Sequence, residues 1–272
     1  MAAWRSARQG LFVLIVSAVA VCAHAQAPAV EEFKPTVGQS GKDVVWVPSP
    51  QAMVDRMLDM AKVTPSDYVM DLGSGDGRTV ITATKRGARA LGIEYNPDMV
   101  TLSRRSAAAA GVSDKATFMQ ADIFQSDISQ ATVITLFLLT DLNLKLRPRL
   151  LSLKPGTRIV SNTFKMGDWD PDQSFELGCD TYCTAYLWIV PARVESTWQL
   201  PNGELMLRQE FQKVTGTLRN GASAVPISSG KLRGDEVRFA VAGAEYRGRV
   251  GDKTIEGTVK SGGNPGAWSA HR

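Results

Sequence analysis

Histidine is almost absent from this sequence of 272 residues, which holds only His24 and His271. The first lies in an N-terminal segment with the features of a cleavable leader, and the second is the penultimate residue. The interior of the chain therefore offers no imidazole. This excludes Ser-His-Asp triads, HExxH metal sites and histidine proton relays. Any chemistry must rely on carboxylates, hydroxyls, backbone groups or a bound cofactor.

Cysteine is also scarce, with three residues in the chain. Two of them, Cys179 and Cys183, come within disulfide reach across a tight loop or one helical turn, but not within a single strand. We expect a small structural disulfide, because two thiols without a nearby histidine make a poor zinc site. The run Asp168, Asp170 and Asp172 lacks the glycine and distal glutamate of a calcium loop, which favours a solvated turn. The sequence therefore predicts no metal site.

The N-terminus has the layout of a secretory signal peptide. Arg5 and Arg8 precede an apolar run over residues 11–23, which ends in Ala23-His24-Ala25. We expect residues 1–25 to be removed after Ala25 and the chain to be exported, to the periplasm or beyond. The apolar run is shorter than the roughly 20 residues that span a bilayer. The alternative is an uncleaved membrane anchor.

Positive charge is modest once the leader is set aside. The formal charge of +4 falls to about +2, because residues 1–25 hold two arginines and no acid (4 − 2). The mature chain would have no membrane span, and its charge gives no support to a nucleic-acid partner.

Strand and helix patterns alternate over residues 26–192, which predicts an α/β fold with a doubly wound, mainly parallel sheet. The expected helices cover residues 51–62, 78–86, 97–110 and 142–153. The expected strands cover residues 68–72, 88–94, 116–120, 131–138 and 157–163.

The texture changes in residues 193–272, where short alternating segments are separated by turn pairs such as Asn202-Gly203 and Asn220-Gly221. This pattern predicts a small C-terminal antiparallel all-β domain of about six strands. Such a domain could close as a barrel or extend the first sheet, and periodicity does not choose between them. The role of this domain is not assigned.

A glycine-rich turn follows the first expected strand. That strand ends in Asp71, and Gly73, Gly75 and Gly77 alternate before the next helix, with Ser74 and Asp76 between them. Glycine permits positive φ and the close approach of a ligand to the backbone, and the first amides of a helix can face that ligand. The spacing differs from the GxGxxG of dinucleotide sites.

Two further acids complete a crevice at the carboxyl ends of successive strands, where ligands bind in such sheets. Glu94 can accept hydrogen bonds from ribose hydroxyls, and Asp122 can accept from an adenine amine while Ile123 packs on the ring. Asp71 suits a ligand with cationic amino and sulfonium groups. Together these residues predict a site for S-adenosylmethionine (SAM).

Three segments, DLGSGDG at 71–77, GIEYNP at 92–97 and QADIF at 120–124, resemble the SAM-binding motifs of class I (seven-strand) methyltransferases. More narrowly, WVPSP at 46–50 and LFLLTDLN at 136–143 resemble the group that includes protein-lysine methyltransferases acting on ATP synthase subunits. The resemblance extends over about residues 43–192. It implies a Rossmann-like fold, SAM as cofactor, and transfer of its methyl group to an acceptor, most simply a protein side chain such as lysine.

Four residues are candidates for the rim of the pocket that would hold the methyl acceptor. They are Trp46, Thr140, Asp141 and Asn143. Two other interpretations stay open. Trp46 could pack in the interior, and residues 140–143 could form the N-terminal cap of the following helix, with Asp141 as the capping residue. No catalytic residue is assigned, since methyl transfer mainly requires alignment and exclusion of water.

The expected export leaves a second function class open, because SAM is made in the cytosol. The alternative is an exported binding or scaffold protein that keeps a methyltransferase fold and recognises its partner through the C-terminal β domain.

Overall fold

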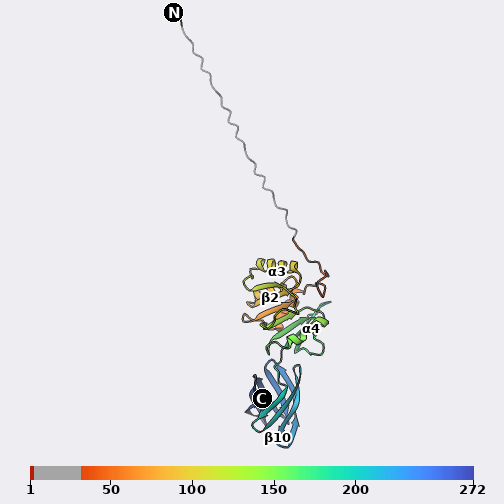
Figure 1. Ribbon diagram of the computed structural model, residues 1–272, viewed down its shortest axis with the longest axis vertical. Helices are drawn as coiled ribbons and strands as arrows, with labels where there is room; N and C mark the ends of the chain where they lie inside the picture. Colours follow the sequence, from red (N-terminus) through yellow and green to blue (C-terminus); the bar gives the residue numbers. More distant parts are fainter. Residues whose placement is uncertain (3–31) are drawn as a thin grey trace. The chain divides into compact units, whose positions relative to one another are not determined.

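The computed structural model describes residues 1–2 and 32–272 of the chain (Figure 1). The chain divides into Met1–Phe33 and a compact unit, Lys34–Arg272. The expected signal peptide, including the cleavage site after Ala25, lies outside the described residues. Within the described residues, no helix combines the length and apolar character needed to cross a bilayer.

In the compact unit, the first sheet has seven strands in the order β3-β2-β1-β4-β5-β7-β6. Strands β1 to β5 are parallel, while β7 pairs antiparallel with both β5 and β6. The predicted α/β fold with a mainly parallel sheet is therefore confirmed. The bounds are β1 (Tyr68–Leu72), β2 (Arg89–Glu94), β3 (Ala116–Gln120), β4 (Val133–Leu136), β5 (Arg158–Asn162), β6 (Gln173–Glu176) and β7 (Thr184–Ile189).

Four helices accompany these strands within residues 32–272, and their bounds agree with the expected ones to within about three residues. Asn96 caps α3 by accepting a hydrogen bond from the Asp98 amide at 2.9 Å, with Pro97 in the first turn. Gly77 caps α2 with a φ of +80°. The helices are α1 (Gln51–Met60), α2 (Arg78–Lys85), α3 (Pro97–Ala109) and α4 (Thr140–Leu150).

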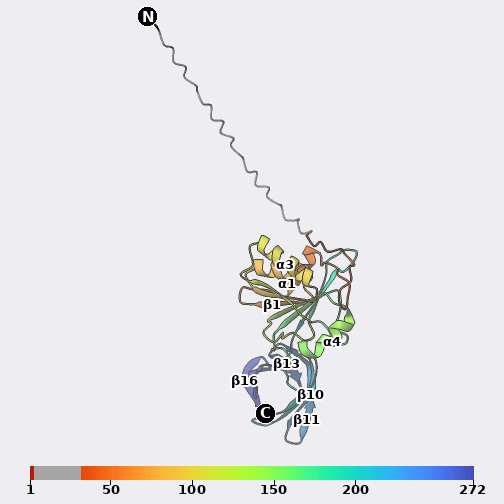
Figure 2. The same ribbon diagram turned by 45° about the horizontal axis from the view of Figure 1, so that its top comes forward.

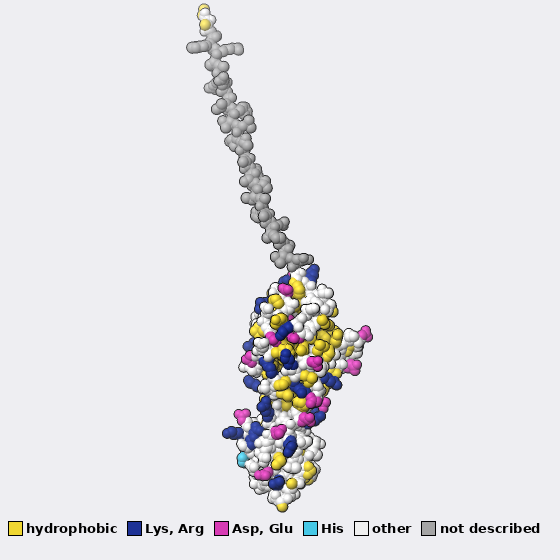
Figure 3. All heavy atoms as spheres, turned by 45° about the vertical axis from the view of Figure 1, so that its right-hand side comes forward, with side chains coloured by type: hydrophobic (Ala, Val, Ile, Leu, Met, Phe, Trp, Pro, Cys, Tyr) yellow, Lys and Arg dark blue, Asp and Glu magenta, His cyan; other side chains and the backbone are white. Residues whose placement is uncertain are grey.

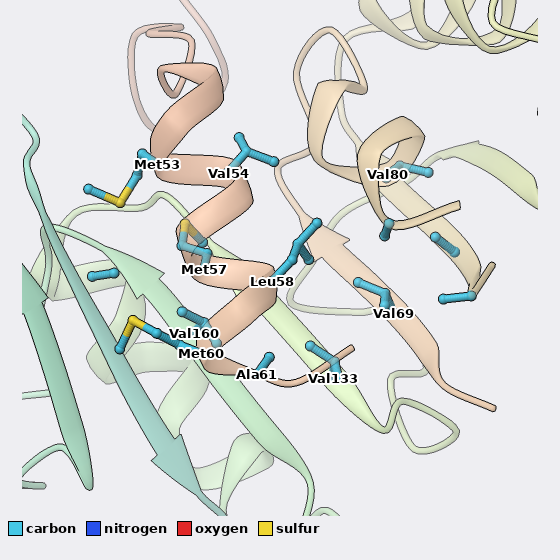
Figure 4. Packing of buried hydrophobic residues seen from close by; sticks show 14 of the residues in the cluster. Met53, Val54, Met57, Leu58, Met60, Ala61, Val69, Val80, Val133 and Val160 are labelled. Atoms are coloured by element: carbon cyan, nitrogen blue, oxygen red, sulfur yellow. The ribbon is translucent and has the colours of Figure 1, made fainter. Parts of the chain in front are cut away.

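Both faces of the sheet are covered by apolar side chains, because successive residues of a strand point to opposite faces. Val69 of β1 faces the cluster that contains Leu58 of α1, whereas Met70 faces the cluster that contains Leu146 of α4. Figure 4 shows α1 lying over β1, β4 and β5, with its apolar side chains pointing into the first cluster. Burial of each large apolar side chain contributes roughly 1.5–3 kcal/mol.

The second sheet is an antiparallel barrel, and within residues 196–271 it has nine strands (Figure 2). Pairing between β9 and β10 closes it, and Trp198, Leu207 and Phe239 lie in its core. The predicted antiparallel domain is confirmed, but the expected count of six strands was too low. The strands are β8 (Ser196–Leu200), β9 (Gly203–Glu210), β10 (Lys213–Asn220), β11 (Ser223–Pro226), β12 (Ser228–Arg233), β13 (Glu236–Val241), β14 (Ala244–Val250), β15 (Thr254–Ser261) and β16 (Asn264–His271).

The three aspartates near Pro171 are each paired with a cation. Asp168 pairs with Arg147, Asp170 with Lys213 at 2.8 Å, and Asp172 with Lys231 at 3.6 Å. Their partners come from different elements, so the carboxylates do not converge. Within the described chain, no group of three or more Asp, Glu, His or Cys residues could hold a metal ion.

Asp67 links the amino ends of three neighbouring strands, β1, β4 and β5. These strand ends lie on the side of the sheet opposite to the glycine turn. It is 6% exposed and accepts hydrogen bonds from the Thr64 amide at 2.8 Å, the Thr132 hydroxyl at 2.7 Å and the Arg158 guanidinium. Burial by itself raises the pKa of the Asp67 carboxyl, but these hydrogen bonds outweigh burial and hold the pKa below its ordinary value.

We predict that Asp67→Asn lowers the free energy of unfolding by about 2–3 kcal/mol at neutral pH, because Arg158 loses its buried counterion. Since the folded-state pKa is depressed, this stabilisation is present above the ordinary carboxyl pKa and is lost as pH falls through the lowered value. Urea unfolding at neutral and acidic pH measures both effects. Glu236→Gln, which breaks exposed pairs with Arg238 and Arg249, should cost less than about 1 kcal/mol. Equal losses in the two variants would contradict the prediction.

Candidate functional site

One cavity lies at the carboxyl ends of β1, β2, β3 and β4 and brings most of the predicted cofactor residues together. Gly77 is the exception, since it lies behind the turn and caps α2. The predicted cofactor residues that line the cavity are Asp71, Gly73, Ser74, Gly75, Asp76, Glu94, Asp122 and Ile123.

The glycine turn is held against the end of β2 by a carboxylate. The Gly75 amide donates to Glu94 Oε2 at 2.9 Å, and Gly75 has a φ of +53°. A Cβ at this position would lie 2.7 Å from Trp46 Nε1, so only glycine fits here without displacing the indole. At Gly77 a Cβ would lie 2.7 Å from the ring of Phe118. The turn therefore requires glycine for both its dihedral angles and its contacts.

Asp71 lies buried beneath this turn and accepts a hydrogen bond from Thr135 Oγ1 at 2.6 Å. Burial raises the pKa of the Asp71 carboxyl to about 7, and the negative charges of Glu94 and Asp76 add to this. Hydrogen bonds from Thr135 and Thr79 act in the opposite direction but do not outweigh burial. Near neutral pH, Asp71 thus exists in both protonated and ionised forms.

Glu94 and Asp76 line the cavity in different ways. Glu94 accepts the Gly75 amide with one oxygen and the Asn96 amide with the other, both at 2.9 Å. Each carboxylate oxygen has further acceptor capacity, so Glu94 can still receive hydroxyl donors from a ligand. Asp76 is paired with Arg78 at 2.6 Å, and Arg78 donates to the Ser49 carbonyl at 2.8 Å. Asp76 thereby ties the turn to the segment that precedes α1.

We call residues 36–49, which line much of the cavity, the strap. A short antiparallel pairing folds it back on itself, with the Gly38 amide donating to the Trp46 carbonyl and the Trp46 amide donating to the Gln39 carbonyl, both at 2.9 Å. The strap places Trp46 on the Gly75 backbone. Trp46 therefore both packs and lines the cavity, so the two interpretations of this residue are compatible.

The strap also places a cation on Asp122. Lys42 Nζ lies 2.7 Å from Asp122 Oδ2 and 5.0 Å from the centre of the Tyr95 ring, while the Phe124 amide donates to Asp122 Oδ1 at 2.8 Å. The hydrogen bond from Lys42 is the main cause that lowers the pKa of Asp122. Recognition of an adenine amine by Asp122 stays a prediction, in which the amine would share the carboxylate with Lys42 or replace it.

Thr140, Asp141 and Asn143 are not among the residues that line the cavity. The burial of Asn143 corrects the expectation for that residue, whereas a place on the rim for Thr140 and Asp141, which lie between the lining residues Leu139 and Leu142, stays a prediction. The helix begins at Thr140, two residues earlier than expected, and Leu139 is its cap residue without a side-chain hydrogen bond, so Asp141 is not the cap. Asn143 is fully buried and donates to the Phe164 carbonyl at 3.2 Å. Helical periodicity turns this polar side chain toward the core, and the cavity is lined instead by Leu139 and Leu142.

Four aromatic residues that the sequence did not single out for the site also line the cavity, namely Tyr95, Phe137, Phe164 and Tyr182. Tyr182 is in the loop closed by a disulfide between Cys179 and Cys183, whose Cα atoms lie 5.5 Å apart. The close spacing of Cys179 and Cys183 was the one feature of the sequence that could have pointed to Tyr182, because it predicts a constrained loop. It does not show that this loop faces the cavity.

Residues 71–173 match the family described as the ANTKMT methyltransferase domain. Among solved structures, the chain is similar to an RNA methyltransferase from Salinibacter ruber in complex with S-adenosylhomocysteine. The two are 50% identical with a TM-score of 0.52, over 54% of this chain and 96% of that one. The cofactor of this chain is SAM.

The residues of the cavity fit this cofactor. The Ser74 hydroxyl is buried without a hydrogen-bond partner among the described residues, which is costly unless a ligand supplies one. Carboxylates at Asp71, Glu94 and Asp122 offer acceptors for a ligand rich in hydroxyl, amino and cationic groups. When bound, SAM supplies a methyl group on a cationic sulfur, from which a nucleophile can displace it.

We predict that SAM binds more tightly as pH rises from about 5.5 to about 7.5, by roughly tenfold, because ionised Asp71 favours a cationic ligand. The raised pKa also means that ionisation of Asp71 destabilises the ligand-free fold, so its stability should decrease as pH rises toward 7. Calorimetric titration and thermal unfolding across this range measure the two effects. Asp71→Asn should flatten both dependences, and an unchanged pH profile in this variant would contradict the assignment.

Curated proteins that are similar in sequence to this chain are also methyltransferases. The chain is 40% identical over 151 residues to a protein-lysine N-methyltransferase from Saccharolobus islandicus, covering 94% of that protein and 54% of this one. It is 34% identical over 137 residues to a Mus musculus lysine N-methyltransferase named for an ATP synthase subunit, covering 55% of that protein and 50% of this one. With the motifs, the sheet and the cavity, these similarities show that the chain is an enzyme and belongs to the SAM-dependent methyltransferase family that includes these protein-lysine methyltransferases.

Proposed function

We propose that the methyl acceptor is a protein and that the methylated group is the side-chain amine of a lysine. The names of the relatives from Saccharolobus islandicus and Mus musculus support this acceptor. The observation that carries the proposal is the wall of Leu139, Leu142 and Phe137, which lines the same cavity as the glycine turn. Such a wall suits the aliphatic stem of lysine and offers no partner to the N–H donors of an unmethylated ammonium group.

The apolar wall would help to deprotonate the acceptor. A lysine amine must lose a proton before it can attack, and surroundings of low polarity lower the pKa of an ammonium group. The neutral amine would then present its lone pair to the methyl group that bound SAM supplies. Trp46 and the rest of the strap would exclude water and restrict the approach of the acceptor, which is the main requirement of such a displacement.

The rim of the cavity also favours a protein over a nucleic acid. Val45, Tyr95, Leu139 and Tyr182 are 38–55% exposed, and all of them line the cavity. On the face drawn in Figure 3, cationic and acidic side chains are interspersed among hydrophobic ones and form no continuous cationic band. Cationic side chains that contact phosphates supply much of the affinity for nucleic acids, so this face offers little for such binding. The Salinibacter ruber protein is nevertheless described as an RNA methyltransferase, so RNA is the second candidate acceptor.

We predict that the purified chain transfers label from methyl-labelled SAM to protein in a cell extract, and that hydrolysis releases it as methylated lysine. Label that resists ribonuclease and is removed by protease supports the proposal, whereas label in RNA, lipid or a small molecule refutes it. Glu94→Gln removes a charged acceptor from the cofactor site and should lower transfer at least about tenfold. Met206→Ala, at an exposed barrel residue far along the sequence from the motifs, is the matched control.

We also infer that the enzyme works outside the cytosol. The signal-like N-terminus and the Cys179–Cys183 disulfide support this location, since disulfides persist in oxidising compartments. The comparisons lend no support to a scaffold without activity. Cell fractionation followed by N-terminal sequencing should find a mature chain that begins at Gln26. A cytosolic chain with its N-terminus intact would refute export, and an intact chain in the membrane fraction would indicate an anchor.

A further inference from the structure

Phe137, Phe164 and Tyr182 form a cluster of three rings, which we call the aromatic wall. The ring centres of Phe137 and Tyr182 are 5.1 Å apart, with the planes at 74°. Those of Phe137 and Phe164 are 6.1 Å apart, and those of Phe164 and Tyr182 are 6.4 Å apart. All three residues line the cavity. The three rings therefore form one continuous aromatic surface on the cavity, over which a cation could be attracted.

Tyr182 is held in the aromatic wall by its loop. Its backbone is in the left-handed region, with a φ of +57°, which is unusual for a residue other than glycine. The disulfide closes the loop on either side of Tyr182, and the Leu177 amide donates to the Cys183 carbonyl at 2.7 Å, where Cys183 is buried. The tyrosine itself is 38% exposed and lines the cavity, so part of this residue is accessible to a ligand. Because Tyr182 is not buried, packing alone does not hold its ring in place, and the disulfide restricts the loop that carries it.

The chemistry of the aromatic wall selects a particular kind of cation. Aromatic faces attract positive charge, but they offer no acceptor to match the three donors of a bare ammonium group. Each methyl group added to the nitrogen removes one donor and spreads the charge over a larger apolar surface. The cavity carboxylates Asp71, Glu94 and Asp122 are placed for the cofactor, at the glycine turn and the strand ends. A methylated ammonium therefore fits the wall better than an unmethylated one.

We propose that the aromatic wall binds the methylated ammonium of the acceptor, and that Tyr182, fixed by the disulfide, is its specificity-determining residue. This inference rests on the proposed lysine acceptor. Once one methyl group has been transferred, the wall retains the methylated ammonium at the site, and a second transfer follows each time this group loses its proton. Each transfer forms one N–C bond, breaks one C–S bond with the electron pair left on sulfur, and releases one proton to water.

Binding of choline by the full chain tests the wall without any methylation. Ligand-observed NMR compares choline with 3,3-dimethylbutan-1-ol, which has the same shape but no charge. We expect choline to bind about five- to tenfold more tightly, Tyr182→Ala to abolish this preference and Tyr182→Phe to retain it. Met206→Ala is the control at another exposed apolar side chain. Equal binding of the two compounds by the unaltered chain overturns the proposal.

Product analysis tests the consequence for methylation. With a lysine acceptor, Tyr182→Ala should lower kcat/KM for a monomethylated peptide at least about fivefold more than for the unmethylated peptide. Reduction of the disulfide, or the double change Cys179→Ser and Cys183→Ser, should act like Tyr182→Ala. An equal loss for both peptides would indicate a merely structural role and overturn the proposal. If no lysine is methylated but choline is still preferred, the proposed acceptor fails while the wall stands.

Discussion

The contact between Glu94 and the glycine turn is the interaction on which the rest of the site depends. The two carboxylate oxygens of Glu94 accept hydrogen bonds from the amides of Gly75 and Asn96. This one carboxylate therefore joins the turn after β1 to the end of β2. Gly75 in turn supports the indole of Trp46, and through it the strap that covers the cavity. The same negative charge helps to keep Asp71 partly protonated. Glu94 therefore contributes to the shape of the cofactor pocket, to the position of the strap and to the raised pKa of Asp71.

Much of this arrangement could be predicted from the sequence, because strand order in a parallel sheet brings strand ends together. Asp71, Glu94 and Asp122 follow three successive strands, and they line one cavity as expected. The expectation failed where packing rather than pattern decides. Asn143 was expected at the rim, but the phase of α4 turns it into the core, where it satisfies the backbone after β5.

Contacts between distant parts of the chain were beyond the reach of periodicity. The choice between a closed barrel and a longer first sheet depends on the pairing of β9 with β10 and of β16 with β8. Strand β6 was missed because it is short, mostly exposed and at the sheet edge, so it shows no alternation. Tyr182 was missed because it lies in a loop. Periodicity shows which face of a helix or strand a residue occupies, but it does not show what a loop residue contacts.

The ion pair between Lys42 and Asp122 has a consequence for measurements in salt. Both side chains are partly exposed, so added salt screens the pair and weakens the hold of the strap on Asp122. Salt equally weakens the attraction of the acidic cavity for a cationic cofactor. If the cofactor replaces Lys42, these two effects oppose each other, and the affinity should vary with ionic strength far less than the number of acids in the cavity would suggest.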